Sequence, residues 1–198
     1  MSVAERLAHV ETERLVCERL RSEHASELIS LHRDPRVART LELTGEPPSQ
    51  AQIFERLSAK IAHWERYGFG LWLLRDRRSG AMVGRGGLQH TFVAGRAEIE
   101  VGWAIVPARW GQGLATEMAH AAVAAAFDEL ALREIVAFTL PHNTASRRVM
   151  EKAGFVFERS IIHVGMQHVL YRRHVGEPGR EVAPMVTLSR PTSGRSHC

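Results

Sequence analysis

The chain has 198 residues, of which 44% are hydrophobic and 24% charged, and its net charge is +4. This length suits one domain with a substantial core and is short for two. Because no basic run reaches five residues and no apolar run could span a bilayer, we expect neither direct nucleic-acid binding nor membrane insertion. The charged N-terminal region has no apolar signal core, which favours a cytoplasmic location.

Cysteine and histidine usage indicates neither a disulfide framework nor a metal site. The two cysteines, Cys17 and Cys198, form no CxxC pair. His163, His168 and His174 are close in sequence, but no HxxxH pair with a flanking carboxylate occurs among them. We therefore expect no bound metal.

The first half of the chain predicts three strands and two helices. The strands are expected at 13–20, 69–75 and 81–90, and the helices at 22–32 and 50–67. Asp34-Pro35 is the expected stop of the first helix. Ser49 is the expected N-cap of the second helix, and Gly68 ends it.

The second half of the chain predicts four more strands and two helices. The strands are expected at 97–106, 133–140, 155–160 and 163–175. A long alanine-rich helix should follow Gly113, and Asn143 should cap a short helix that ends before Gly154. In the strand at 97–106, Glu98 and Glu100 face one side while Val101 and Trp103 face the other.

This order of elements predicts an α/β domain of the α+β type. Its sheet should be mostly antiparallel, with one βαβ crossover in the middle. We expect residues 1–175 to form this single domain. Residues 176–198 are rich in Gly, Pro, Ser and Arg without a period, and are expected to be a flexible tail.

The stretch RWGQGLATE (Arg109–Glu117) places two glycines between a predicted strand and a predicted helix. A Walker A loop is excluded because no lysine follows Gly113, and the GxGxxG fingerprint has Thr116 at its third glycine position. Two interpretations remain from the residues alone. The glycines make a tight strand-to-helix turn, or they expose backbone amides that bind a pyrophosphate at the helix N-terminus.

Two motifs in the same order resemble the GNAT acetyltransferase superfamily. They are EVGWAIVPARWGQGLATE and, after an intervening strand, LPHNTASRRVMEKAGF. The resemblance covers roughly Val10 to Val175 and is strongest from Glu98 to Phe157, and the subgroup it is most similar to contains ribosomal-protein N-terminal acetyltransferases. It implies a sheet of about six to seven strands flanked by about four helices, with the βαβ unit binding acetyl-CoA.

The resemblance also implies the cofactor-binding residues. Main-chain groups of Ala104 and Ile105 would bond the pantetheine arm as if it were another strand, and Asn143 would lie near it. Trp110 stands where the family usually has Gln or Arg. The pyrophosphate would bind the amides of Gly111, Gln112, Gly113, Leu114, Ala115 and Thr116. Arg147 and Arg148 could meet the phosphates or remain solvated.

By the same resemblance, Ser146 would lie near the cofactor sulfur and protonate the leaving thiolate. Without the resemblance, Ser146 is an ordinary residue of the first helical turn that needs no function. Many family members use a tyrosine as this acid, but neither Tyr67 nor Tyr171 follows Asn143 at the usual distance.

The expected general base is Glu100, which occupies a frequent acidic position of the family. The alternative is a solvated or ion-paired strand glutamate, and His90 and His142 are weaker candidates for the base. A modest base suffices for an α-amine, whose pKa is roughly 8, whereas a lysine amine has a pKa of roughly 10.4.

The acceptor stays open at this point. It could be a protein or peptide α-amine, or a small amine such as an amino acid, polyamine or aminoglycoside; the remaining alternative is a CoA-binding module without turnover. The loops Leu41–Pro48 and His90–Arg96 should shape the acceptor site. Monomer and homodimer are equally compatible with the sequence.

Overall fold

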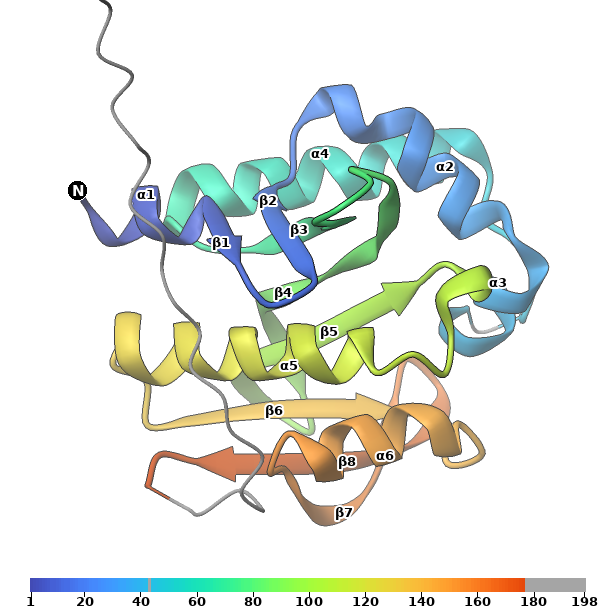
Figure 1. The fold of residues 1–198 in the computed structure, drawn as a ribbon. Helices are drawn as coiled ribbons and strands as arrows, with labels where there is room; N and C mark the ends of the chain where they lie inside the picture. The colour runs from blue at the N-terminus through green and yellow to red at the C-terminus, as the bar shows by residue number, and fades with distance from the viewer. Residues whose placement is uncertain (43, 177–198) are drawn as a thin grey trace, which may run out of the picture.

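The computed structural model describes residues 1–42 and 44–176. In these residues one eight-stranded sheet has the order β1-β2-β3-β4-β5-β6-β8-β7 and is accompanied by six α-helices (Figure 1). The strands are β1 (His9–Glu11), β2 (Leu15–Arg19), β3 (Leu71–Asp76), β4 (Met82–Val93), β5 (Arg96–Ile105), β6 (Glu134–Thr139), β7 (Val156–His163) and β8 (Met166–His174). The α-helices are α1 (Val3–Leu7), α2 (Ala25–Arg33), α3 (Pro35–Leu41), α4 (Gln50–Tyr67), α5 (Leu114–Ala124) and α6 (Thr144–Lys152).

The expected α/β class is confirmed, with one strand and two helices more than the sequence suggested. The additional elements are α1, β1 and α3. A capping box between Ser2 and Glu5 begins α1. The side chain of Asp34 accepts a hydrogen bond from the amide of Arg36, and Pro35 occupies the first turn of α3. The pair Asp34-Pro35 therefore ends one helix and begins the next.

Three predicted helix caps are confirmed. Ser49 caps α4 in a capping box with Gln52, and Gly68 ends the helix with a left-handed φ of 72°. Asn143 caps α6, since its side chain accepts a hydrogen bond from the amide of Ser146. The alanine-rich helix differs from the prediction at its end, because α5 passes into a π-helical segment at Ala125–Glu129.

The sheet is antiparallel at every strand pair except β5–β6, which is parallel. These two strands are paired at a single position, Glu100 with Val136. Beyond this point β5 continues to Ile105 and β6 to Thr139, but the two strands do not pair with each other again. The sheet is therefore open between the carboxyl ends of its two central strands.

Helices cover both faces of the sheet. On one face α5 packs against β4 and β5. Helix α6 lies beside α5 on the same face, in front of β8 in the view of Figure 1. Gly86 permits this packing, because a Cβ there would lie 2.7 Å from Met118 of α5. On the other face α2 and α4 pack together, with Trp64 of α4 donating a hydrogen bond to the carbonyl of Leu71.

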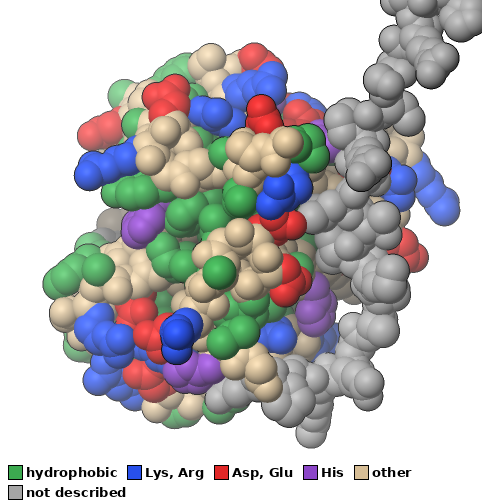
Figure 2. All heavy atoms as spheres, turned by 90° about the vertical axis from the view of Figure 1, so that its left-hand side faces the viewer, with side chains coloured by type: hydrophobic (Ala, Val, Ile, Leu, Met, Phe, Trp, Pro, Cys, Tyr) green, Lys and Arg blue, Asp and Glu red, His purple; other side chains and the backbone are tan. Residues whose placement is uncertain are grey.

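The surface carries charges of both signs. On the face shown in Figure 2, Lys and Arg side chains lie interspersed with Asp and Glu side chains. No helix within residues 1–42 and 44–176 is long and apolar enough to cross a membrane. In the same residues no three His, Cys, Asp or Glu side chains gather as metal ligands. Cys198 and nearly all of the expected tail, residues 177–198, lie outside the described residues.

Candidate functional site

A cavity of about 500 Å³ lies where β5 and β6 separate. It brings together the glycine-bearing turn after β5 and the first turn of α6, which are far apart in the sequence. Of the predicted site residues it is lined by Glu100, Ala104, Ile105, Gly111, Gly113, Leu114, Ala115, Thr116, Asn143 and Ser146. Gln112 is the predicted site residue that does not line it.

The open edge of β5 presents main-chain groups to this cavity. The amide of Val106 donates to the carbonyl of Val83 at 2.8 Å, so the even-numbered residues of this strand bond to β4. By alternation, the amides and carbonyls of Trp103 and Ile105 point away from β4 to the open side. One of these groups is already bonded, because the indole Nε1 of Trp110 donates to the carbonyl of Ile105 at 2.6 Å.

This register changes the expectation for Ala104. Its backbone groups point to β4, so they do not fit main-chain bonding to a ligand in the opening between β5 and β6. Ala104 contributes to the cavity wall instead, whereas Trp103 joins Ile105 on the open edge. Residue spacing alone could not distinguish the two registers.

The turn between β5 and α5 has its amides available for an anion. Gly111 and Gly113 have left-handed φ values of 74° and 78°, which favour glycine at both positions. Gly113 is the N-cap of α5, and no side chain caps this helix in the described structure. The first turn of α5 therefore directs unpaired amides and the positive end of the helix dipole to the cavity.

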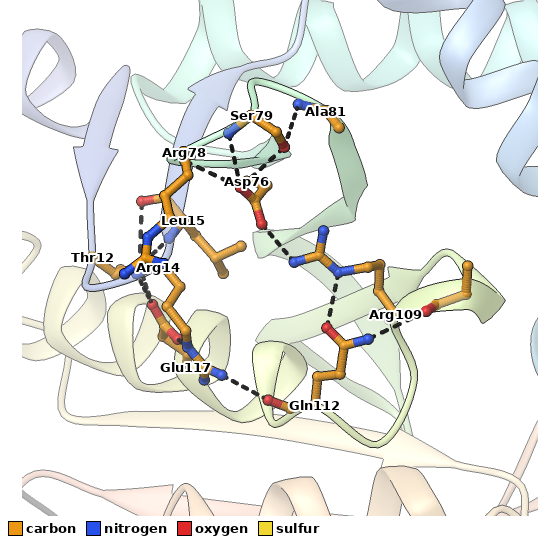
Figure 3. Close-up of polar contacts among 11 residues, drawn as sticks. Thr12, Arg14, Leu15, Asp76, Arg78, Ser79, Ala81, Arg109, Gln112 and Glu117 are labelled. Atoms are coloured by element: carbon orange, nitrogen blue, oxygen red, sulfur yellow. Dashed lines mark hydrogen bonds and ion pairs between the residues drawn. The ribbon is translucent and has the colours of Figure 1, made fainter.

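Side chains behind the turn fix its position (Figure 3). Arg109 donates to Asp76, the last residue of β3, at 2.6 Å and to the side chain of Gln112 at 2.9 Å. The Gln112 side chain also donates to the carbonyl of Ala108 at 3.2 Å. The Arg109 guanidinium, with two hydrogen bonds from Ser79, holds the pKa of Asp76 well below its usual range. Arg109 thus acts as a structural support of the turn.

A second arginine ties the turn to the start of β2. Arg14 donates to the carbonyl of Gln112 at 2.8 Å and forms an ion pair with Glu117 of α5 at 2.7 Å (Figure 3). Glu117 also accepts from the hydroxyl of Thr12 at 2.5 Å. The side chain of Glu117 lies in the first turn of α5, where a negative charge is favourable. The glycine turn is therefore held from both ends.

The first turn of α6 faces the same cavity from the other side. Asn143 uses its side-chain oxygen to accept from the amide of Ser146 at 3.1 Å, which leaves its NH₂ group to act as a donor. Ser146 and Arg148 line the cavity. Arg147 instead donates to the hydroxyl of Tyr171, a side chain that is 1% exposed.

Glu100 lies in the cavity at the last point where β5 and β6 pair. Its Oε2 accepts from Nε2 of Gln89, on β4, at 2.8 Å. Burial raises the pKa of Glu100, although this hydrogen bond and the charges of Arg85, Lys60 and His168 oppose the rise. Glu98, on the same face of the strand, is instead held by a two-point ion pair with Arg172 at 2.9 and 3.1 Å.

The other candidate bases lie elsewhere. His90 packs against Tyr67, with ring centroids 4.0 Å apart, and its Nδ1 is 3.0 Å from Nε2 of His63. His142 is exposed, and neither His90 nor His142 lines the cavity. Sequence reasoning missed several lining residues: Val37, Thr40, Arg85, Gln89 and His168. Alternation along β4 puts Arg85 and Gln89 on one face, but only the pairing register shows that this face also carries Glu100.

Comparisons with known proteins identify the family of the chain. The family model of the acetyltransferase (GNAT) domain matches residues 14–156. The YkkB protein of Bacillus subtilis is 31% identical over 107 residues, which are 54% of this chain and 62% of YkkB. The chain thus spans somewhat less than two thirds of the length of this curated relative.

Solved structures show the same fold. A GnaT-family acetyltransferase from Bordetella pertussis has a TM-score of 0.73 at 28% identity, covering 83% of this chain and 98% of its own. RimL, a ribosomal L7/L12 alpha-N-protein acetyltransferase solved with coenzyme A, has a TM-score of 0.69 at 17% identity over 86% of this chain and 99% of its own. With a family model that covers most of its length, the chain belongs to the GNAT acetyltransferase family.

Proposed function

We propose that this protein transfers the acetyl group of acetyl-CoA to a primary amine. The observation that carries the proposal is one cavity that joins an unpaired strand edge to a glycine turn with free helix amides. A pantetheine arm has amides that can pair with a strand edge, and the pyrophosphate beyond it suits a helix N-terminus. A cofactor that combines these two parts fits both features at once.

In this proposal the pantetheine lies along β5 as an additional strand. The amides of Trp103 and Ile105 and the carbonyl of Trp103 are the groups left for it, because the carbonyl of Ile105 already accepts from Trp110. An amide at this edge can also donate to the thioester carbonyl as negative charge develops on its oxygen. The amides of Gly111 and of residues 113–116, which line the cavity, then bind the pyrophosphate, and Asn143 contributes its NH₂ group to the pantetheine.

Glu100 and Ser146 perform the proton transfers in the proposed reaction. The amine nitrogen attacks the thioester carbon, the new C–N bond forms and the C–S bond breaks. Glu100 takes the proton that the amine loses, which suits a carboxylate whose pKa is raised by burial. Ser146 gives a proton to the departing thiolate and regains one from solvent.

The acceptor class distinguishes two forms of this proposal. RimL, as its name states, acts on the α-amine of a ribosomal protein, and that likeness supports a peptide α-amine here by fold analogy only. A small amine is the second form, and a cofactor-binding module without turnover is the third. A base of modest strength such as Glu100 favours an amine of low pKa over a lysine side chain.

Titration calorimetry tests the cofactor part of the proposal. We expect CoA and acetyl-CoA to bind with one site per chain, and the CoA fragment that lacks pantetheine to bind more weakly. Absence of binding at millimolar CoA would contradict the proposal. Release of free thiol from acetyl-CoA with a panel of amines then separates an enzyme from a binding module.

A further inference from the structure

A second cavity of about 310 Å³ adjoins the first between α2, α4 and β4. The two cavities share Arg85 and Gln89 in their walls. Besides these two, the second cavity exposes the polar side chains of His32, Arg56 and Lys60. It thus extends the proposed active site to the side of the sheet opposite α5.

The strand register fixes which functional groups share this side. Gln89 pairs with Glu100 and Arg85 pairs with Ala104, so their side chains lie on one face of the sheet. Gly86, next to Arg85, faces Met118 of α5 on the other face. Arg85 therefore projects away from the α5 face of the sheet. It shares its face with Glu100, the proposed base.

The second cavity has more positive charge than the described residues neutralise. Arg85 has no carboxylate within 4.0 Å among residues 1–42 and 44–176, and its Nε lies 3.5 Å from Nε2 of His32. Burial, together with the charge of Arg85, lowers the pKa of His32 to about 3, so this imidazole accepts as a neutral ring. Lys60 likewise forms no ion pair in this part of the chain, whereas Arg56 is neutralised by Glu42 at 2.5 Å.

An unpaired cation in the second cavity costs free energy. Burial lowers the pKa values of both Arg85 and Lys60, which means that their charged forms lose hydration there. Glu100 acts on both from a greater distance, but its Oε2 is bonded to Gln89. A bound anion would restore the lost interactions of the guanidinium and the ammonium group.

Within the described residues, Arg85 and Lys60 lack an anion, whereas Gln89 lacks a hydrogen-bond donor. Its Nε2 donates to Glu100, while its Oε1 is buried and has no hydrogen-bond partner in the described structure. A buried amide oxygen without a donor costs free energy, and a nitrogen that carries hydrogens would satisfy it. The wall shared by the two cavities thus requires a donor beside Glu100 and an anion beside Arg85.

We propose that the acceptor is an amine that also carries a carboxylate. Its amino group lies between Glu100 and Oε1 of Gln89, and its carboxylate binds Arg85 and Lys60. This inference rests on the proposed acetyl transfer and narrows its substrate class, and it excludes polycationic acceptors such as polyamines and aminoglycosides. Arg85 and Gln89 are four residues apart on one strand, roughly 13 Å between α-carbons, so the separation of amine and carboxylate is itself a variable.

Matched pairs of amines test the carboxylate directly. Each pair keeps the amine and replaces the carboxylate by a carboxamide: leucine and leucinamide, γ-aminobutyrate and its amide, and alanyl-leucine and its amide. Thiol release and mass spectrometry of the acetylated product give kcat/KM, expressed per neutral amine. We expect at least one acid to exceed its amide by about tenfold to a hundredfold. Equal values in all three pairs, or a faster reaction with spermidine than with every acid, would overturn the proposal.

Variants assign the preference to the cavity. Arg85→Met and Lys60→Met should each reduce the acid-to-amide ratio toward one while CoA affinity stays at the wild-type value. The control is Arg78→Met, the same change at an exposed arginine of the β3–β4 turn, which should keep the ratio. If Arg85→Met does not fold, Lys60→Met carries the test. A loss of CoA affinity in Arg85→Met would assign the guanidinium to the cofactor and overturn the proposal.

The outcomes of these experiments distinguish a failure of the proposed acetyl transfer from a failure of the proposed carboxylate site. If no amine is acetylated and CoA does not bind, the proposed acetyl transfer fails and the acceptor proposal fails with it. If amides and acids are acetylated equally well, the transfer stands and the carboxylate site alone is refuted.

Discussion

Substitution of Gly113 tests whether the turn before α5 binds the cofactor through its backbone. Gly113 has φ of 78°, and among the described residues a Cβ there would meet only the Nη2 of Arg14, at an ordinary 3.5 Å. The cost of a side chain therefore comes from the backbone and not from a clash. For Ala in the left-handed region this cost is about 1–2 kcal/mol; Asn pays less, and a β-branched residue pays more.

The series Gly113→Asn, Gly113→Ala and Gly113→Val should weaken CoA binding progressively. A variant relieves the strain by opening the turn in the free protein, and CoA binding must then restore it. For Ala the full cost corresponds to about a tenfold weaker affinity, divided between folding and binding, and for Val the loss is larger. Any part that appears in folding should lower Tm by about 2–4 °C per kcal/mol.

Gly95 provides the matched control. It lies in the β4–β5 turn, at the other end of β5, with φ of 81°, and a Cβ added there would have no atom of residues 1–42 or 44–176 within 4 Å. The same three substitutions at Gly95 should cost similar stability and leave CoA affinity unchanged. Calorimetry gives the affinities and thermal unfolding gives the stabilities. Folded Gly113 variants that all bind CoA as tightly as the wild type would refute the reasoning.

The remaining predictions concern the proposed proton transfers and the support of the turn. Glu100→Gln should lower kcat by about a hundredfold or more. Protonation of the amine lowers kcat/KM with falling pH in both proteins. Because burial raises the pKa of Glu100, the wild-type profile should become steeper at a pH above 4.5, whereas the variant keeps the slope of the amine alone. Equal slopes would remove Glu100 from the mechanism. Ser146→Ala should lower kcat and keep the CoA dissociation constant, with exposed Thr144→Ala as control, and an unchanged kcat would argue against Ser146 as the acid. Asp76→Asn should raise KM for acetyl-CoA by releasing Arg109, whereas Asp128→Asn should not. The pKa of Asp76 is lowered by folding, so its ion pair stabilises the protein above pH 3.8 and is lost only as pH falls further.

Local signals were sufficient for the helices with strong caps. Ser49 with Gln52, Gly68, and Asn143 act within a few residues of their own position, so the sequence predicts them correctly. Asp34-Pro35 shows the limit of the same reasoning. A proline both ends one helix and suits the first turn of the next, and only packing of Val37 and Ala38 in the interior decides that α3 forms.

Part of the site was predictable because its sequence signals are also local. The two glycines and Asn143 lie in motifs whose residues are close in sequence. The direction of the Ala104 backbone depends on the β4–β5 register, and Lys60 of α4 lines the same cavity as Arg85 of β4 only in the folded chain. Neither the strand register nor the shared cavity leaves a local sequence pattern, since a lysine on a helix and an arginine on a strand are ordinary surface residues until the fold buries them.

Acetyl transfer itself is measured most directly by incubating the protein with acetyl-CoA and an amine panel and following both products. We predict one free CoA thiol for each acetylated amine found by mass spectrometry, with carboxylate-bearing amines reacting fastest and Glu100→Gln greatly slowed. Absence of any acetylated amine, with no thiol released above the rate of spontaneous hydrolysis, would contradict the proposed transfer.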